Sequence, residues 1–446
     1  MSNNINLKQG LNIPISGTAA QKTRKDVAGT VVAIKPTDFK GLLPKLLVKE
    51  GDRVLAGSPV LADKVSQGIL FTSPVSGTVE SVVRGEKRKL LEVRIKADKT
   101  TEYVDFGTKK VNELSAGQVR EALLQSGLWP SFIQRPYGIV ADPQIKPKAI
   151  FVSAFATAPL AADIDYTLRD EFDNIQTGVN AVAKLTDGGV HFSLNGVNFN
   201  GTPLHKIENV IHHTFTGKHP AGNVGVQIHH ISPISKGETV WTISPMMLAA
   251  IGKLFNTGKY DVSRKVAVTG PKAIDPAYVT ALPGMSMTDI ADFYDNSAND
   301  IRFISGDVLT GTNVGAEGFL GFFDNQVTLI KEGNEYEMFG WAKPFRTNLF
   351  SASRTYFSWL TPNKKYDMDT NLHGGPRAFV MSDLYGKVLP MDLYPVHLVK
   401  ACLAGDIDKM EKFGIYEVIE EDLALCEYVC PSKIEIQSIL SDGINL

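Results

Sequence analysis

The chain has 446 residues, of which 43% are hydrophobic and 21% charged, and its formal net charge is −2 at pH 7. This length predicts roughly three domains, and the near-neutral net charge disfavours nucleic-acid binding, which depends on an excess of basic residues. The 3 cysteines and the lack of an apolar N-terminal segment indicate a reducing compartment and no secretion. Without an apolar run of ~20 residues we expect no transmembrane helix.

Residues 1–100 are rich in glycine and β-branched side chains, which predicts a compact all-β unit. Within this unit, segments 48–60 and 73–79 resemble the two halves of a biotinyl/lipoyl barrel-sandwich domain, with glycines where tight turns need a positive φ. In lipoyl carriers the modified lysine lies between these halves, at a place comparable to that of Lys64. The segment after Lys64 differs from that of a carrier, so an ordinary exposed lysine is the favoured interpretation.

From residue 101 helical and strand patterns alternate, which predicts a mostly parallel α/β domain over residues 101–256. Ser115 is expected to cap the first helix of this domain, over residues 116–125. Strands are predicted at residues 148–153, 189–194 and 223–231, and helices at residues 170–184 and 240–255.

The pattern changes again after residue 256, and residues 257–345 predict a small α+β module. Its strands are predicted at residues 265–269, 300–304 and 326–330, with a short helix at residues 287–294. The remaining residues, 346–446, predict a helical domain, because apolar side chains recur at three- and four-residue spacing from Met391 onward.

A stretch at residues 345–366 interleaves aromatic and basic side chains: Phe350, Tyr356, Phe357 and Trp359 with Arg346, Arg354, Lys364 and Lys365. Aromatic and arginine enrichment is typical of protein interfaces, so this stretch is a candidate for docking onto a membrane subunit. The alternative interpretation is a satellite core beneath a long loop.

Near the end of the chain, Cys426, Cys430 and Pro431 form half of an iron–sulfur motif. The full ferredoxin-type motif reads C-x2-C-x2-C-x3-C-P and supplies four thiolates to a cluster. The two upstream ligand positions hold Glu420 and Leu423, so no conventional cluster can form in this segment. The simpler interpretation is that both cysteines are small apolar residues of a C-terminal helix.

Six of the 9 histidines lie between His205 and His230, which suggests a metal site. The predicted strand at residues 223–231 would point His229 and His230 to opposite faces, and this disfavours chelation by the pair. The glycine-rich loop at residues 217–225 precedes the same predicted strand, whereas phosphate sites precede helices. We therefore expect this loop to close the α/β domain near the carboxyl ends of its strands.

Five stretches, in order along the chain, resemble the family of the A subunit of the sodium-translocating NADH:quinone oxidoreductase (Na+-NQR). They are residues 73–79, 217–225, 240–243, 320–327 and 422–431. This family is similar to the C subunit of Rnf complexes and, more remotely, to the flavoprotein subunit of complex I.

The resemblance implies a multidomain α/β and α+β fold of four units. They are a biotinyl/lipoyl-like β barrel-sandwich (1–100), a Rossmann-like α/β domain (101–256), a β-grasp-like module of the SLBB type (257–345) and a C-terminal helical domain (346–446) with the degenerate iron–sulfur motif.

The flavin-binding relatives carry a glycine-rich loop and, after the next strand, acidic residues that contact flavin or nicotinamide. At the first place this chain has Trp129, Pro130 and Phe132, which would obstruct a phosphate. At the second place residues 154–159 include no carboxylate. Together with the missing thiolates, the resemblance implies that this chain holds no flavin, NADH, iron or other metal.

The resemblance also implies a peripheral protein on the cytoplasmic face of the bacterial inner membrane. Its partners would be the other Na+-NQR subunits, especially one integral to the membrane, and those subunits would handle NADH, flavins and Na+. Ubiquinone or a related quinone would be the substrate of the complex, and this chain would contribute to quinone binding and assembly without being catalytic in isolation. The alternative is a purely structural scaffold without a substrate site.

A quinone head group needs a flat apolar surface for its ring and donors for its carbonyl oxygens. Trp129, Phe132, Arg135 and Tyr137 offer both kinds of group within one short segment, and residues 31–39, which end at Phe39, are the candidate for a second wall. A buried aromatic anchor between domains is the alternative interpretation of the same cluster.

Overall fold

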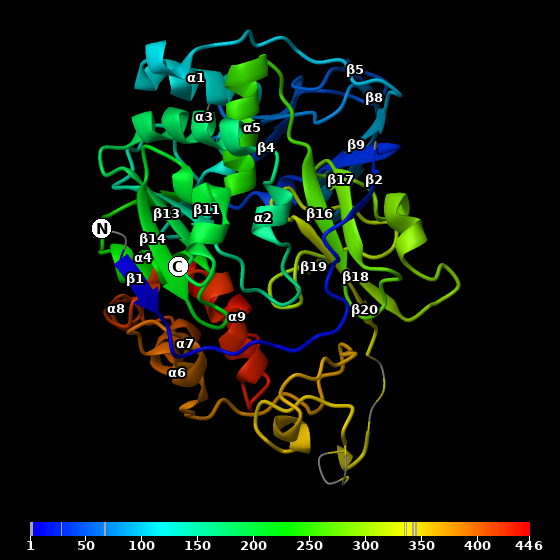
Figure 1. Cartoon of the computed structure of the whole chain (residues 1–446), viewed down its shortest axis with the longest axis vertical. Coiled ribbons are helices and arrows are strands. Elements are labelled where there is room, and N and C mark those ends of the chain that lie inside the picture. The colour runs from blue at the N-terminus through cyan, green and yellow to red at the C-terminus, as the bar shows by residue number, and fades with distance from the viewer. Residues whose placement is uncertain are drawn as a thin grey trace.

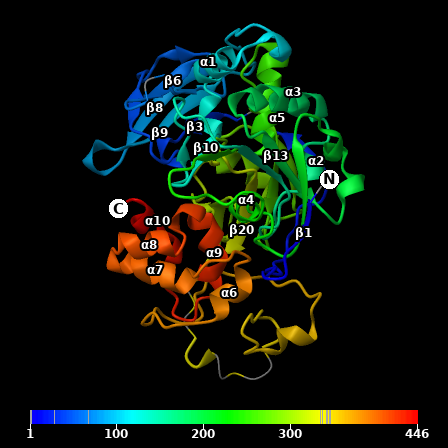
Figure 2. The same ribbon diagram turned by 90° about the vertical axis from the view of Figure 1, so that its left-hand side faces the viewer.

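The computed structural model describes residues 3–27, 29–66, 68–333, 335, 337–340, 343 and 346–446. Two small β-sheets, a seven-stranded sheet with helices on its faces, a six-stranded sheet and a group of helices pack side by side (Figures 1 and 2). The helical group lies at the opposite end of the molecule from the two small sheets (Figure 2).

The two small sheets form the predicted all-β unit. One has the strand order β3-β9-β8-β5 and the other β4-β6-β7. Their bounds are β3 (Val31–Ile34), β4 (Pro44–Leu46), β5 (Arg53–Val54), β6 (Pro59–Asp63), β7 (Leu70–Thr72), β8 (Gly77–Arg84) and β9 (Leu90–Ala97). Lys64 is exposed in the connection between β6 and β7, as expected for an ordinary surface lysine.

The first two strands of the chain pair with strands of the other sheets and not with these two small sheets. β1 (Asn3–Asn6) runs parallel to a strand at residues 211–216, and β2 (Thr23–Asp26) runs parallel to a strand at residues 277–281. Strands this short are placed by partners that lie far away in the sequence, so their local pattern carries little information.

The seven-stranded sheet has the order β1-β14-β13-β12-β15-β10-β11, and neighbouring strands from β1 to β15 are parallel. Its other strands are β10 (Ile133–Arg135), β11 (Ile139–Val140), β12 (Ile150–Ala154), β13 (Val190–Asn195), β14 (Ile211–Thr216) and β15 (Val240–Thr242). The helices of this domain are α1 (Ala116–Ser126), α2 (Ile164–Thr167), α3 (Phe172–Val182), α4 (Val224–Ile231) and α5 (Pro245–Thr257).

Helices cover both faces of this sheet, as in the predicted α/β arrangement. Ile150 and Val152 share a core with α3 and α5. Phe151 points to the other face and packs with Ile228 of α4. The capping of α1 was also predicted correctly, because the Ser115 hydroxyl accepts from the Gln118 N–H at 3.3 Å.

Two predicted elements of this domain were wrong. Residues 223–231 form α4 and not a strand, since their valines and isoleucines recur both at alternate positions and at helical spacing. Residues 240–255 form β15 followed by α5 and not one helix. The break comes at Ser244, whose hydroxyl accepts from the Met247 N–H, and Pro245 takes the first helical position.

The six-stranded sheet has the order β19-β18-β20-β16-β17-β2, and it forms the predicted α+β module. Its further strands are β16 (Arg264–Thr269), β17 (Ala277–Ala281), β18 (Ile301–Ser305), β19 (Thr312–Asn313) and β20 (Gln326–Lys331). The short helix predicted at residues 287–294 is a 3-10 helix, Met287–Phe293.

The C-terminal helices are α6 (Leu384–Val388), α7 (Pro395–Ala404), α8 (Ile407–Lys412), α9 (Glu420–Val429) and α10 (Ile436–Ile444). Within the described residues between Arg346 and α6 the only helix is the 3-10 helix Phe357–Leu360, so the predicted helical domain becomes helical only near Leu384. No helix in the described part of the chain is both long enough and apolar enough to cross a bilayer.

Further 3-10 helices in the described ranges are Pro36–Asp38, Glu86–Arg88, Val111–Glu113, Trp129–Ser131, Ala183–Leu185, Phe199–Gly201, Pro203–Lys206 and Ile415–Glu417.

Candidate functional site

Two of the predicted quinone-binding residues lie in the protein core. Trp129 and Phe132 are fully buried, and both pack against Trp241 of β15 with ring centroids 5.3 and 5.6 Å apart. The indole N–H of Trp129 donates to the carbonyl oxygen of Ala141 at 2.8 Å. Neither ring offers a surface to a ligand, so the buried-anchor interpretation describes them.

Arg135 is also buried, and both of its terminal nitrogens pair with carboxylates of α9. Its Nη1 lies 2.7 Å from Oδ2 of Asp422, and its Nη2 pairs with the carboxylate of Glu421. Arg135 and Asp422 are each 1% exposed. This ion pair connects the seven-stranded sheet to the C-terminal helices and keeps the guanidinium group away from any surface that a quinone could reach.

Tyr137 lies on the surface, 43% exposed, with its ring near that of Tyr416. The predicted cluster of four residues therefore does not form one binding surface. Two members are core, one is an interdomain ion-pair residue and one faces solvent. The aromatic and donor groups that a quinone needs are close in sequence, but the backbone directs their side chains to different parts of the fold.

The glycine-rich loop at residues 217–225 precedes helix α4, and not the expected strand. A helix N-terminus attracts negative charge. At this one, a Cβ on Gly225 would lie 2.4 Å from both Nη1 of Arg135 and Oδ1 of Asp422. The ion pair of Arg135 and Asp422 thus packs directly against the first turn of α4.

The half iron–sulfur motif is packed as core. Cys426 and Cys430 are each 1% exposed and Leu423 is fully buried, within one hydrophobic cluster. The Tyr385 hydroxyl donates to Sγ of Cys430 at 3.0 Å, and burial raises the pKa of Cys426. Across the described ranges, no group of three or more His, Cys, Asp or Glu side chains is placed to hold a metal ion.

The two adjacent histidines lie on α4, not on a strand, and both bind the C-terminal helical unit. Nδ1 of His229 lies 2.6 Å from Glu417, and its Nε2 accepts from the Asp392 N–H at 3.0 Å. Nε2 of His230 donates to the Pro390 carbonyl at 2.8 Å. These side chains hold α4 against its neighbours and are structural.

A polar pocket with a cavity volume of about 180 Å³ lies at the carboxyl end of β12. Thr157 and Gly222 line it from the α/β domain, and Asp307 and Asp324 line it from the six-stranded-sheet module. Burial raises the pKa of both aspartates. The loop at residues 217–225 does close this edge of the sheet, as predicted, and this is where ligands of such sheets bind.

His219 in this loop makes the protein sensitive to acid. Its side chain is 3% exposed, and burial lowers its pKa to about 4, whereas an unfolded chain has a histidine pKa of ~6.5. As pH falls from about 7 to about 5, only the unfolded chain gains this proton, so the native state should lose about 2 kcal/mol. Urea unfolding of wild type and His219→Gln at both pH values measures this loss in the free energy of unfolding.

The variant should lose about 2 kcal/mol less stability than wild type over this pH change. The matched control is His397→Gln, because His397 is exposed. Equal losses in His219→Gln and wild type would show that His219 is not the group responsible.

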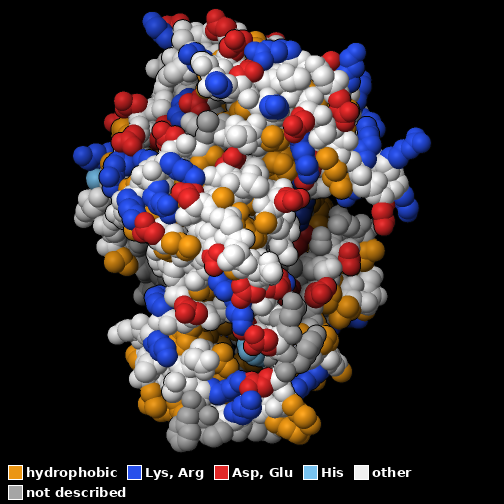
Figure 3. Space-filling model, turned by 90° about the vertical axis from the view of Figure 1, so that its right-hand side faces the viewer, with side chains coloured by type: hydrophobic (Ala, Val, Ile, Leu, Met, Phe, Trp, Pro, Cys, Tyr) orange, Lys and Arg blue, Asp and Glu red, His pale blue; other side chains and the backbone are white. Residues whose placement is uncertain are grey.

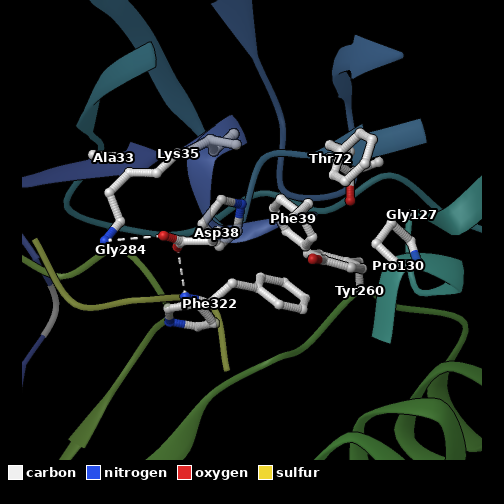
Figure 4. Close-up of a pocket in the computed structure, with 14 residues that line it drawn as sticks. Ala33, Lys35, Asp38, Phe39, Thr72, Gly127, Pro130, Tyr260, Gly284 and Phe322 are labelled. Atoms are coloured by element: carbon white, nitrogen blue, oxygen red, sulfur yellow. Dashed lines mark hydrogen bonds and ion pairs between the residues drawn. The ribbon is translucent and has the colours of Figure 1, made fainter. Parts of the chain in front are cut away.

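The fifth predicted residue, Phe39, lines a narrow pocket where three units of the protein meet (Figure 4). The barrel-sandwich contributes Phe39 and Thr72, the α/β domain contributes Pro130 and Tyr260, and the six-stranded-sheet module contributes Phe322. Ring centroids of Phe39 and Phe322 are 4.9 Å apart. The cavity volume is about 30 Å³, which is room for a water molecule or two.

One end of this pocket is charged and the other carries hydroxyl groups. Nζ of Lys35 lies 3.3 Å from Asp38, and Asp38 accepts from the Phe322 N–H at 2.8 Å. Burial raises the pKa of Asp38. Burial also raises the pKa of Tyr260 to about 12, although a hydrogen bond with Thr72 acts in the opposite direction, and the Tyr260 side chain is a protonated phenol at neutral pH. Aromatic faces beside one donor suit a flat ring with a carbonyl group.

The sequence singled out Phe39 within residues 31–39, which also include Asp38, but it did not mark Tyr260 or Phe322, which lie in two other segments of the chain. One residue that could have pointed to this pocket is Gly284. It has a φ of 80°, and a Cβ at this position would lie 2.1 Å from the Ala33 carbonyl oxygen. Only glycine allows that close contact between the two domains.

Comparison with known proteins gives matches along most of the chain. Three family models match in order: "NqrA N-terminal barrel-sandwich hybrid domain" at residues 5–98, "NqrA second alpha/beta domain" at 114–260 and "NQRA C-terminal domain" at 265–316. A solved NAD+-reducing [NiFe]-hydrogenase aligns at 10% identity with a TM-score of 0.37, covering 77% of this chain and 66% of that one, which is too low to support any argument.

Two of the similar curated proteins are each named as the A subunit of Na(+)-translocating NADH-quinone reductase. The protein of Rhodopirellula baltica is 38% identical over 444 residues, covering 98% of this chain and 97% of its own. That of Serratia proteamaculans is 38% identical over 447 residues, covering 99% and 98%. In each comparison the similarity therefore extends over nearly the whole length of this chain and of the relative.

Proposed function

Because the chain belongs to the family of the A subunit of Na(+)-translocating NADH-quinone reductase, we propose that it is a peripheral subunit that holds no redox group of its own. It contributes quinone contact and assembly, on the cytoplasmic face of the bacterial inner membrane. Partner subunits, including an integral membrane subunit, carry NADH, the flavins and the Na+ path. The chain acts within the complex and is not catalytic alone.

The observation that carries this proposal is that packing fills the places where the resemblance puts cofactors. Trp129 and Phe132 occupy the position of a flavin-binding glycine loop, and both are buried. Cys426 and Cys430 point into a hydrophobic core beside Leu423. Side chains in close contact leave no volume for a flavin or a cluster.

The absence of a redox group predicts a simple analytical result. Chain purified without oxygen should contain iron, acid-labile sulfide and flavin far below one per molecule, with no visible absorption band. A flavoprotein and a ferredoxin carried through the same procedure control for losses. Stoichiometric flavin, or about four irons per chain, would contradict the proposal.

For the quinone contact, the pocket around Phe39 is better supported than the predicted segment at residues 129–137. It combines the rings of Phe39 and Phe322 with the hydroxyl of Tyr260 (Figure 4). At about 30 Å³ it is too narrow for a quinone ring as it stands. Entry therefore requires the lining side chains to move apart, and Phe322, which is half-buried, is less enclosed than Phe39, which is buried.

The second candidate is the purely structural scaffold, and the burial of Trp129, Phe132 and Arg135 favours it. Under that function the chain holds its partners in place and touches no quinone. The KM for quinone in a complex with an altered Phe39 pocket separates the two, because a scaffold would leave it unchanged.

A further inference from the structure

We propose that residues 346–366 form a membrane-contact loop that binds the anionic lipid headgroups of a bilayer directly. This goes beyond the proposed role within the complex, because it assigns the lipid surface itself, and not a protein partner, to this loop. The predicted docking stretch begins at Phe345, which lies outside the described residues, whereas residues 346–366 lie within them.

The loop presents a compact apolar surface. In the 3-10 helix Phe357–Leu360, Ser358 is buried while Phe357, Trp359 and Leu360 are 55%, 54% and 60% exposed. Scattered exposed apolar residues are common, but three large ones within four positions are not. Tryptophan in particular favours the headgroup level of a bilayer, where one edge of its ring meets water.

Contacts within the protein hold the loop in this arrangement. Ser358 accepts from the Ser351 N–H at 3.1 Å. Tyr366 is 3% exposed, its N–H donates to the Pro14 carbonyl at 2.8 Å, and its ring packs near Phe350. The outward position of the apolar residues is therefore set by buried anchors on the other side of the loop.

The charge of the loop suits an anionic surface. No Asp or Glu occurs between Arg346 and Tyr366. The carboxylate of Glu337 pairs with Arg346. Arg354, Lys364 and Lys365 are exposed, and none of them takes part in an ion pair among the residues that the structure describes. Three cations beside three exposed apolar side chains match an acidic headgroup layer.

A lipid partner fits this composition better than a protein partner does. The cores of protein interfaces are depleted in lysine, whereas lysine side chains at a membrane reach headgroups while their stems lie along apolar surface. The loop also lies at the end of the molecule farthest from the barrel-sandwich (Figure 1), where hydrophobic and basic side chains meet (Figure 3). Among the described residues, Phe357, Trp359 and Leu360 each remain more than half exposed.

The test is co-sedimentation of the full chain with phosphatidylcholine vesicles, with and without phosphatidylglycerol. Binding is expected only with phosphatidylglycerol and should weaken in high salt. The variant Arg354→Gln/Lys364→Gln/Lys365→Gln should lower the partition coefficient about 100-fold. The matched control, Lys45→Gln/Lys49→Gln/Lys99→Gln, removes three exposed lysines at the other end of the molecule and should leave it unchanged.

Tryptophan fluorescence gives a second readout that does not depend on charge. Vesicle binding should shift the emission to shorter wavelength, and Trp359→Phe should abolish that shift while retaining most binding. Absence of binding to anionic vesicles, or an equal fall in both triple variants, would overturn the proposal. A third result would also overturn it: the wild-type chain does not bind vesicles, and the loop variant no longer assembles with the other subunits. The loop would then be a protein interface. Quinone kinetics do not affect these outcomes.

Discussion

Replacing Arg135 with methionine is expected to lower the free energy of unfolding by about 3–5 kcal/mol. The substitution keeps much of the side-chain volume but leaves the buried carboxylate of Asp422 without its cation. Oδ1 of Asp422 already lacks a hydrogen-bond partner among the described residues, so little else can compensate. Urea unfolding measures the total effect, and hydrogen exchange in α9 locates it.

The double variant Arg135→Met/Asp422→Leu should recover most of that loss, because it removes both fully buried charges, whereas the remaining partner, Glu421, has a side chain that is 39% exposed and reaches water. The matched control is Lys148→Met, which breaks the exposed pair with Glu238 and should cost at most about 1 kcal/mol. If Arg135→Met costs no more than the control, the ion pair does not hold the C-terminal helices to the sheet.

The same ion pair explains part of what the sequence could and could not predict. The interpretation of Cys426 and Cys430 as small apolar helix residues needed only their local sequence, and the structure packs both cysteines as core. The sequence did not indicate that the Asp422 side chain lies beside α4 and pairs with Arg135 of β10. The partners are 287 residues apart, and nothing local marks a buried ion pair.

Local signals succeeded where neighbouring residues determine the structure. The capping of α1 by Ser115 needs only positions within one turn. Local signals failed for residues 223–231, because their apolar pattern fits the period of a strand and that of a helix equally well. In the fold this segment is helical and packs against Phe151. The strands β1 and β2 were missed because sheet pairing across the chain places them.

For the candidate site, the residues that the sequence singled out do not lie together in the fold. Trp129, Phe132 and Arg135 are close in sequence, but Trp129 and Phe132 are buried in the core and Arg135 pairs with α9. Phe39, which was the subsidiary candidate, is the member that reaches a pocket. A site made by three units has no continuous motif, so only the assembled fold can bring Phe39, Tyr260 and Phe322 together.

Replacing Phe39 with leucine in the assembled enzyme complex is expected to raise the KM for quinone about tenfold with little change in kcat. Leucine keeps an apolar side chain but removes the flat ring that a quinone would stack on. The pocket also loses the edge contact between Phe39 and Phe71, whose ring centroids are 4.6 Å apart. The effect is therefore on binding, and electron transfer in the other subunits should proceed as before.

Two controls make this comparison specific. Phe303→Leu removes another buried ring, in the core of the six-stranded-sheet module and away from the pocket, so it reports general destabilisation. Trp129→Phe retains an aromatic core residue and tests the predicted segment instead of the pocket. Both variants should keep the wild-type KM once assembly has been verified.

The KM for quinone in the Phe39→Leu complex, measured beside these two controls, tests most directly whether this chain contacts quinone. A rise of about tenfold confined to Phe39→Leu is the expected result. An unchanged KM in that variant would contradict the quinone contact and leave the chain as a structural scaffold.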